Sequence, residues 1–190
     1  MRPELIMYVG GMFSGKTSRL LSNLERFKYQ QRKVFAFKPR VDDRYSDSEI
    51  ASHMGWRYPA TRVSIGAELI KELLAQFPDG VVKSDCVVAV DEAFMIPGVA
   101  DELVWLFKNG ITVLVSTLDL SSSCIPFEEV TRLFPYATTV HKCTAVCDVC
   151  QDDAGYTWRK PVDNETEILV GGGDIYSPRC RLHHPQMRLE

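Results

Sequence analysis

The stretch with the most specific chemistry is the glycine-rich "GGMFSGKT" at residues 10–17. It fits the pattern of a glycine, four residues, then glycine, lysine and serine or threonine. Gly10 and Gly15 allow the backbone to wrap around phosphate oxygens, and the start of a following helix supplies amide donors. Lys16 is expected to reach the outer phosphates, and Thr17 to bind Mg²⁺ through its hydroxyl. The segment predicts a nucleotide phosphate loop rather than a simple glycine turn, with these candidate ligands: Gly10, Gly11, Met12, Phe13, Ser14, Gly15, Lys16 and Thr17.

An acidic pair, Asp91 and Glu92, follows the apolar run "VVAV". In open α/β sheets, ligands bind at the carboxyl ends of the strands. Asp91 is therefore a candidate to hold Mg²⁺, directly or through water. Glu92 points to the other side of the pleat and could act as a general base on an acceptor hydroxyl or an attacking water. A solvated strand end without a chemical role is the alternative, and the phosphate loop makes it the less favoured one.

A third group of chemically versatile residues comprises Cys147, Cys150, Cys180 and His183. Two pairs with this i, i+3 spacing make a Cys₃His set, which is typical of closed, tetrahedral structural zinc sites. Zinc would join the two ends of residues 151–179 and remove much of the conformational entropy of that loop. The sequence therefore predicts a zinc ion that serves structure and not chemistry.

The alternatives for these residues are a redox dithiol or unrelated thiols. His184 is an adjacent rival for the fourth ligand position, but its spacing is less favourable. The remaining cysteines, Cys86, Cys124 and Cys143, are expected to be buried thiols.

The elements that must position these residues alternate along the chain. Helical periodicity follows the phosphate loop and recurs in residues 64–77, with Ser64 as a possible N-cap, and in residues 97–110. This alternation predicts right-handed crossovers and an open α/β sheet with helices on both faces. The expected strands are runs that are nearly continuous in apolar residues, as in buried parallel sheets, and they lie at 4–9, 34–38, 86–91 and 111–117.

The composition and periodicity of the sequence change after about residue 140. The rest has short β-like pieces, Pro161 and three consecutive glycines, with no helical period. We therefore expect a nucleotide-binding domain over residues 1–142 and a small β-rich module over residues 143–190. Residues 38–60 are polar and aperiodic, which predicts a long functional or mobile loop.

Composition narrows the functional classes. A chain of 190 residues that is 45% hydrophobic can bury a sizeable core. The net charge of −3 argues against a nucleic-acid binder, and the apolar runs are too short to span a membrane. Six cysteines, two of them in a Cys-x-x-Cys pair, fit a metal site or free thiols in a reducing cytosol.

The phosphate loop, the Asp-Glu pair, the paired metal ligands and "GGGDIYSPRCRLHH" occur in this order in one family. The chain resembles the type II, cellular-type thymidine kinases over nearly its whole length, and "DDRYS" and "YTWR" are also similar to family stretches. The resemblance implies a P-loop NTPase-like core, a zinc-bearing lasso domain over the nucleoside, and transfer of the ATP γ-phosphate to the 5′-hydroxyl of thymidine. It also implies a homo-oligomer, commonly a tetramer, that is inhibited by the triphosphate end product. Together with the cysteine usage, this favours a cytoplasmic protein.

The resemblance assigns roles residue by residue. Glu92 falls on the family's catalytic base, Asp91 on the magnesium-side carboxylate, and Lys16 with Thr17 on the phosphate-loop pair. Positions near the phosphates and the acceptor sugar are Asp42 and Arg44, and positions around the thymine ring are Met12, Leu118, Thr157 and Tyr176.

Two departures from the family pattern lie beside the base pocket. The family usually continues Asp-Glu-x-Gln-Phe, whereas this chain has Phe94 and Met95 at the last two positions. Ser122 stands roughly where the family packs an aromatic residue. We therefore expect broader tolerance at the pyrimidine 5-position, with purine nucleosides excluded. The rival interpretation is a P-loop ATPase or nucleotide switch with no nucleoside acceptor, and a zinc-module nucleic-acid binder ranks below it.

Overall fold

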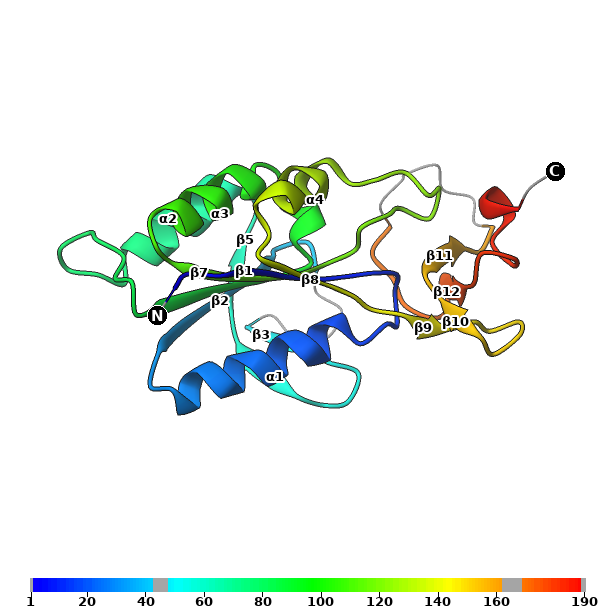
Figure 1. Ribbon diagram of the computed structural model, residues 1–190, viewed down its shortest axis with the longest axis horizontal. Coiled ribbons are helices and arrows are strands. Elements are labelled where there is room, and N and C mark those ends of the chain that lie inside the picture. Colours follow the sequence, from blue (N-terminus) through cyan, green and yellow to red (C-terminus); the bar gives the residue numbers. More distant parts are fainter. Residues whose placement is uncertain (1, 43–47, 162–168, 189–190) are drawn as a thin grey trace.

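The computed structural model describes residues 2–42, 48–161 and 169–188. Its centre is a parallel sheet with the strand order β5-β2-β6-β7-β1-β8 (Figure 1). Every residue of β6 and β7 is buried, as the continuous apolar runs predict. The predicted α/β class is thereby confirmed. The strands of this sheet are β1 (Leu5–Val9), β2 (Lys33–Pro39), β5 (Thr61–Val63), β6 (Cys86–Asp91), β7 (Thr112–Thr117) and β8 (Thr139–Lys142).

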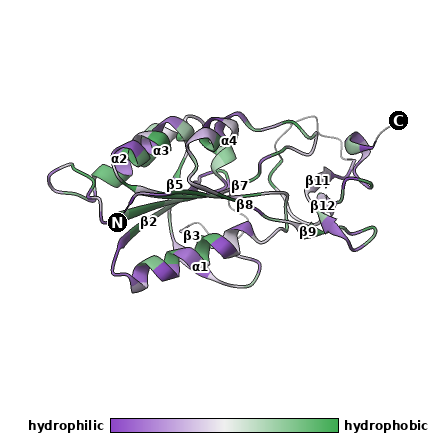
Figure 2. Cartoon of the chain, viewed as in Figure 1, coloured by the Kyte–Doolittle hydropathy of each residue, from purple (hydrophilic) through white to green (hydrophobic). Residues whose placement is uncertain are grey.

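Helices cover both faces of the sheet (Figure 1). Alternate side chains of β1 divide between two cores: Leu5 and Met7 belong to one cluster, and Ile6 and Tyr8 to the other. Figure 2 shows hydrophobic residues along the central strands and hydrophilic ones on the outer sides of the helices. One face carries α2 (Gly66–Leu74), α3 (Val99–Lys108) and α4 (Glu128–Leu133); the other carries α1 (Lys16–Tyr29) with β3 (Glu49–Ala51) and β4 (Arg57–Pro59).

Sequence patterns missed part of this arrangement. The segment 38–60, expected as a loop, contains the antiparallel pair β3 and β4. The prediction of Ser64 as an N-cap was wrong, because α2 begins at Gly66 with Ile65 as its N-cap. Ser64 instead donates its backbone N–H to the Glu68 carboxylate at 2.6 Å. Gly66 packs against the backbone of Gly98 so closely that a Cβ would collide there.

The C-terminal part forms small antiparallel pairs beyond one end of the main sheet (Figure 1). They are β9 (Ala145–Val146) with β10 (Asp153–Ala154), and β11 (Tyr156–Arg159) with β12 (Tyr176–Arg179). The last strand of the main sheet, β8, ends at Lys142. Among the described residues, no helix is both long and apolar enough to cross a membrane.

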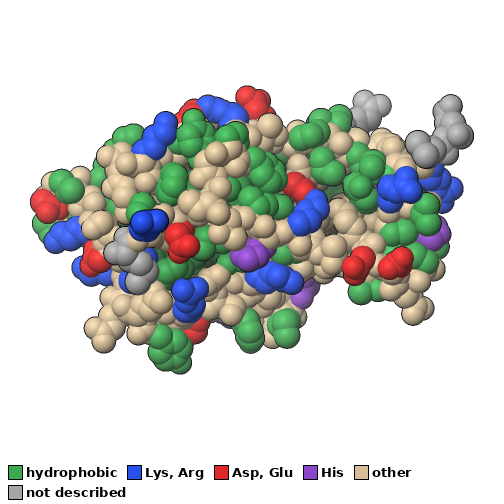
Figure 3. Space-filling model, in the orientation of Figure 1, with side chains coloured by type: hydrophobic (Ala, Val, Ile, Leu, Met, Phe, Trp, Pro, Cys, Tyr) green, Lys and Arg blue, Asp and Glu red, His purple; other side chains and the backbone are tan. Residues whose placement is uncertain are grey.

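The face of the molecule that Figure 3 shows has no dominant charge. Figure 3 shows Lys and Arg side chains interspersed with Asp and Glu on the face in view. On that face, charge is spread over the sheet domain and the C-terminal module alike, without a continuous basic band.

Candidate active site

The phosphate loop joins β1 to α1. Gly15 is the N-cap of α1 and has a φ of 74°, a left-handed conformation that favours glycine. Gly10 has a φ of 145° and lies so close to the carbonyl of Cys143 that a Cβ would collide with it. The Lys16 ammonium donates a 2.7 Å hydrogen bond to the carbonyl of Gly11. Burial lowers the pKa of Lys16. The phosphate loop therefore wraps around the side chain of Lys16, which hydrogen-bonds to the backbone of the loop.

The first turn of α1 meets the end of β6 at Thr17 and Asp91. The Thr17 hydroxyl lies 3.2 Å and 3.3 Å from the two carboxylate oxygens of Asp91. Burial, followed by the charge of Glu92, raises the pKa of Asp91 to about 7. A hydroxyl and a carboxylate are oxygen ligands of the kind that Mg²⁺ binds. A divalent cation would also offset the electrostatic cost of ionising this buried acid.

A cavity of about 270 Å³ opens beside this pair. The phosphate loop lines this cavity from Met12 onward. The acidic residues in its wall are Asp42, Asp91 and Glu92. Lys38, only 3% exposed, contributes a cation from the end of β2. Arg44, predicted near the phosphates, lies outside the described residues.

The hairpin β3–β4 contributes a wall of this cavity that the sequence did not predict. Ile50 and His53 line the cavity, and the His53 ring lies 5.7 Å from that of Phe13. Sequence patterns held no signal for this wall, because it depends on how the hairpin packs beside α1.

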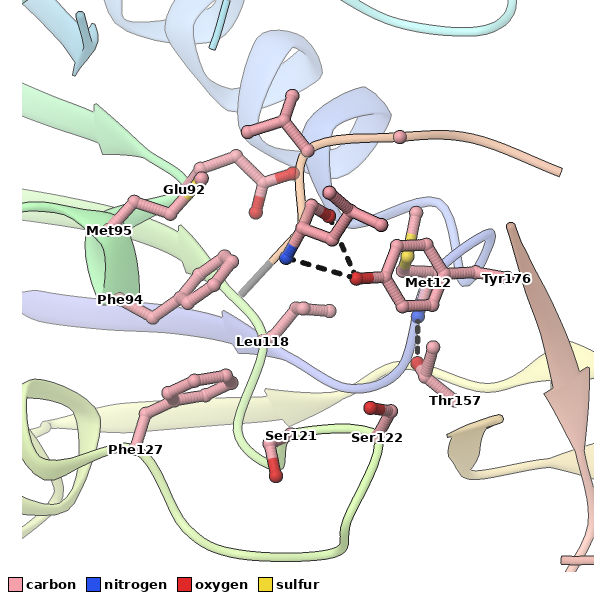
Figure 4. A pocket seen from close by; sticks show the side chains of 13 residues that line it. Met12, Glu92, Phe94, Met95, Leu118, Ser121, Ser122, Phe127, Thr157 and Tyr176 are labelled. Atoms are coloured by element: carbon pink, nitrogen blue, oxygen red, sulfur yellow. Dashed lines mark hydrogen bonds between the residues drawn. The ribbon is translucent and has the colours of Figure 1, made fainter. Parts of the chain in front are cut away.

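A second pocket, largely apolar, adjoins the first (Figure 4). Its volume is about 40 Å³, room for only a few water molecules. The rings of Phe94 and Phe127 form one wall, with centroids 4.5 Å apart. The Tyr176 hydroxyl donates to the carbonyl of Leu169 at 2.8 Å and accepts its N–H at 3.3 Å. Other lining residues are Met12, Glu92, Met95, Leu118, Ser121, Ser122, Thr157, Val170 and Gly171.

Glu92 and Met12 line both cavities. Glu92 has a φ of 51° and a ψ of 44°, a left-handed conformation that is uncommon outside glycine. The turn that follows, Ala93–Met95, is held by a hydrogen bond from the Phe94 N–H to the Thr117 hydroxyl at 3.1 Å. The carboxylate of Glu92 thus lies where the phosphate cavity meets the apolar pocket, as expected of a base between two reacting groups.

The C-terminal module is joined to the phosphate loop by a hydrogen bond. The Met12 N–H donates to the Thr157 hydroxyl at 2.8 Å. Thr157 is 4% exposed and lines the apolar pocket. The amide of Met12 is therefore engaged by β11, while its side chain lines both cavities.

The four predicted metal ligands gather at the base of the C-terminal module. Their ligand atoms all lie within 4.8 Å of one another, so this group could hold a metal ion. The Cys180 sulfur is 3.1 Å from Nδ1 of His183 and 3.7 Å from the sulfur of Cys150. Although burial opposes ionisation of Cys147, hydrogen bonds from backbone N–H groups lower its pKa to about 6. A thiolate set with one imidazole suits zinc.

His184, the rival ligand, turns away from this cluster toward Cys124 and Thr157. Cys86 and Cys143 are buried as expected, but Cys124 is only half-buried and contacts His184. The sequence held no signal for that contact, since the two residues are far apart in the chain.

The structure brings the described candidates for the phosphate and nucleoside sites into two adjoining groups. The phosphate-loop residues from Met12 onward gather with Asp42 and Asp91 around the phosphate cavity. Leu118, Thr157 and Tyr176 gather with Met12 around the apolar pocket. One pocket residue that the sequence did not single out, Lys38, lies at the end of β2. The others come from turns and loops: His53, Ser121, Phe127, Leu169, Val170 and Gly171.

Comparisons with known proteins agree over almost the whole chain. The model of a family described as thymidine kinase matches residues 3–184. A thymidine kinase of Mesoplasma florum is 40% identical over 184 residues, which cover 94% of this chain and 88% of that protein. A thymidine kinase of Thermococcus kodakarensis is 38% identical over 189 residues, which cover 95% and 93%.

Proposed function

The chain belongs to the thymidine kinase family and is an ATP-dependent thymidine kinase, and we propose that its two joined cavities carry out this reaction. ATP places its phosphates in the larger cavity, and thymidine occupies the apolar pocket. The observation that carries this assignment is that Glu92 and Met12 line both cavities. The 5′-hydroxyl then meets the γ-phosphate beside the Glu92 carboxylate.

The phosphate loop supplies charge and position. Lys16 leaves the carbonyl of Gly11 and contacts the β- and γ-phosphates, while the loop amides and the start of α1 hold their oxygens. Thr17 and Asp91 would hold Mg²⁺, which neutralises phosphate charge when bound. Arg44 is proposed as a further cation near the phosphates, and Asp42 as a contact to the acceptor sugar.

Glu92 acts as the general base. It accepts the proton of the 5′-hydroxyl as the oxygen attacks the γ-phosphorus, and ADP leaves on the opposite side. The phosphate cavity lies on one side of Glu92 and the apolar pocket on the other, which supports this role. After dTMP and ADP dissociate, Glu92 releases this proton to water and returns to its carboxylate form.

The nucleoside pocket must widen when thymidine enters, because about 40 Å³ is too small for a pyrimidine ring. Residues 169–171 and Tyr176 of the C-terminal module form one wall of the pocket, and we propose that this wall moves outward and then closes on the base. Backbone groups of this wall hold the base edge. Met12, Leu118 and Thr157 surround the ring together with the Phe94–Phe127 pair.

We propose that residues 143–190 form the lasso domain and that Zn²⁺ on Cys147, Cys150, Cys180 and His183 fixes its two ends. Zinc would serve structure here, since four protein ligands leave no open position for water or substrate. Family resemblance further supports a cytoplasmic homotetramer, which light scattering on purified protein would test.

A coupled assay tests the proposed reaction. ADP release with ATP and Mg²⁺ should depend on thymidine and be negligible without it. A P-loop ATPase or nucleotide switch would release ADP at the same rate in both conditions, and that result would overturn the assignment.

A further inference from the structure

His184 is a buried histidine that the proposed reaction does not use. Its side chain is 1% exposed, and it follows the metal-ligand candidate His183 in the chain. Nε2 of His184 lies 3.2 Å from the carbonyl oxygen of Thr157. A carbonyl has no proton to give, so Nε2 carries the hydrogen and donates it. In the neutral ring Nδ1 is then an acceptor, and the Cys124 sulfur lies 3.5 Å from it.

These partners belong to two walls of the nucleoside pocket. Thr157 lies on β11, and its hydroxyl lines the pocket and accepts the Met12 N–H. Cys124 belongs to the loop after β7, in which Ser121 and Ser122 line the same pocket. Cys124 has a φ of 59°, so this loop bends through a conformation that a non-glycine residue adopts only when its surroundings hold it.

The ring therefore bridges segments that are distant in sequence. One neighbour of His184 in the chain is His183, whose Nδ1 is 3.1 Å from the Cys180 sulfur. On its other side the ring contacts β11 and the loop after β7. A continuous chain of contacts runs from the metal-ligand cluster through His184 and Thr157 to Met12 of the phosphate loop.

We propose that His184 is a positioning residue that holds β11 and the loop after β7 at the separation the nucleoside requires, and so links the zinc cluster to nucleoside affinity. It does not touch substrate. This inference rests on the proposed function of the apolar pocket. It predicts an effect on thymidine that is separate from the effects on ATP and on zinc content.

The test compares His184→Leu with His184→Gln. Leucine keeps apolar bulk but cannot donate to Thr157, whereas the glutamine amide can. His184→Leu should raise the KM for thymidine about tenfold. Its kcat, its KM for ATP and its zinc content should stay within about twofold of wild type. His184→Gln should recover most of the thymidine affinity.

A matched control is His141→Leu, because His141 is exposed and lies outside both cavities. It should leave both KM values unchanged. If His184→Leu does not fold, Cys124→Ala tests the same bridge, since it removes the thiol that faces Nδ1. That variant should raise the KM for thymidine about two- to threefold.

Three results would overturn the inference: loss of zinc from His184→Leu, a parallel rise in both KM values, or no change in either. If wild-type protein shows no thymidine-dependent turnover, the proposed function fails first. If wild type is active but His184→Leu changes the KM for thymidine and the KM for ATP to the same extent, only the role of His184 fails.

Discussion

Asp91 shows at the scale of one residue how burial of a carboxylate can lower the stability of the fold. Burial raises its pKa from 3.8 to about 7, with Glu92 adding to the effect. A raised pKa in the folded state means that the protonated acid is favoured on folding. The associated stability is fully present below about pH 4 and is lost as the pH rises through 7. Nucleotide-free protein should therefore be destabilised by this group at pH 8.

We predict that Asp91→Asn raises the Tm of nucleotide-free protein at pH 8 by at least about 2 °C, and that the gain shrinks toward pH 5. The same variant should lose activity, because it removes a proposed Mg²⁺ ligand. Thermal melts at the two pH values without nucleotide check this. A lower Tm for the variant at pH 8 would show that the buried carboxylate stabilises the fold.

Ser122 sets the second prediction at this scale. It lines the apolar pocket and also a neighbouring cavity of about 180 Å³ that includes Trp158 and Arg159. A hydrophobic pocket distinguishes one methyl by only about 1–3 kcal/mol. With space beyond Ser122, 5-hydroxymethyl-deoxyuridine and a larger 5-alkyl analogue should keep kcat/KM within about tenfold of thymidine.

Ser122→Phe provides the matched comparison, because the larger ring would fill the gap between the two cavities. It should reduce activity on the larger analogues more than on thymidine. If the kcat/KM values of the analogues are about a hundredfold below that of thymidine in wild type, then Ser122 does not widen the pocket for larger 5-substituents.

At the scale of elements, the metal-ligand cluster should govern the C-terminal module. We predict that Cys180→Ser removes zinc and weakens thymidine binding more than ATP binding, because the segment 151–179 loses the anchor at one end. Cys86→Ala is a suitable control, since Cys86 is buried outside the cluster. For both variants, elemental analysis measures the zinc content, and hydrogen exchange in residues 151–161 and 169–179 measures how firmly the segment is held. Fully active protein without zinc would contradict the role of the cluster.

The elements also show what the sequence could and could not predict. Continuous apolar runs predicted β6 and β7, because both are buried on both faces. The edge strand β8 was missed, since it is short and mostly exposed. Local motifs predicted the phosphate loop and the metal-ligand set, whose spacing is itself the signal. Phe127 and Leu169 join the pocket only through tertiary packing, for which the sequence gives no local pattern.

At the scale of the whole molecule, the proposed reaction brings two substrates together at the Glu92 carboxylate, with the C-terminal module closing over one of them. The hydrogen bond of Thr17 to Asp91 joins the phosphate loop to β6, and the hydrogen bond of Met12 to Thr157 joins it to the C-terminal module. Thymidine should therefore slow hydrogen exchange in residues 169–176, and a non-hydrolysable ATP analogue should slow it in residues 10–18. Equal protection of both regions by either ligand would show that the cavities do not divide the substrates.

The catalytic role of Glu92 is tested by the thymidine-dependent turnover of Glu92→Gln, which keeps the shape of the side chain but removes the base. We predict that kcat falls by roughly 10²–10⁴-fold, the usual range for a general base. Thymidine affinity and zinc content should be unchanged. Glu128→Gln, at an exposed position of α4, should match wild type. Near-normal turnover of Glu92→Gln would contradict the placement of the catalytic base between the two cavities.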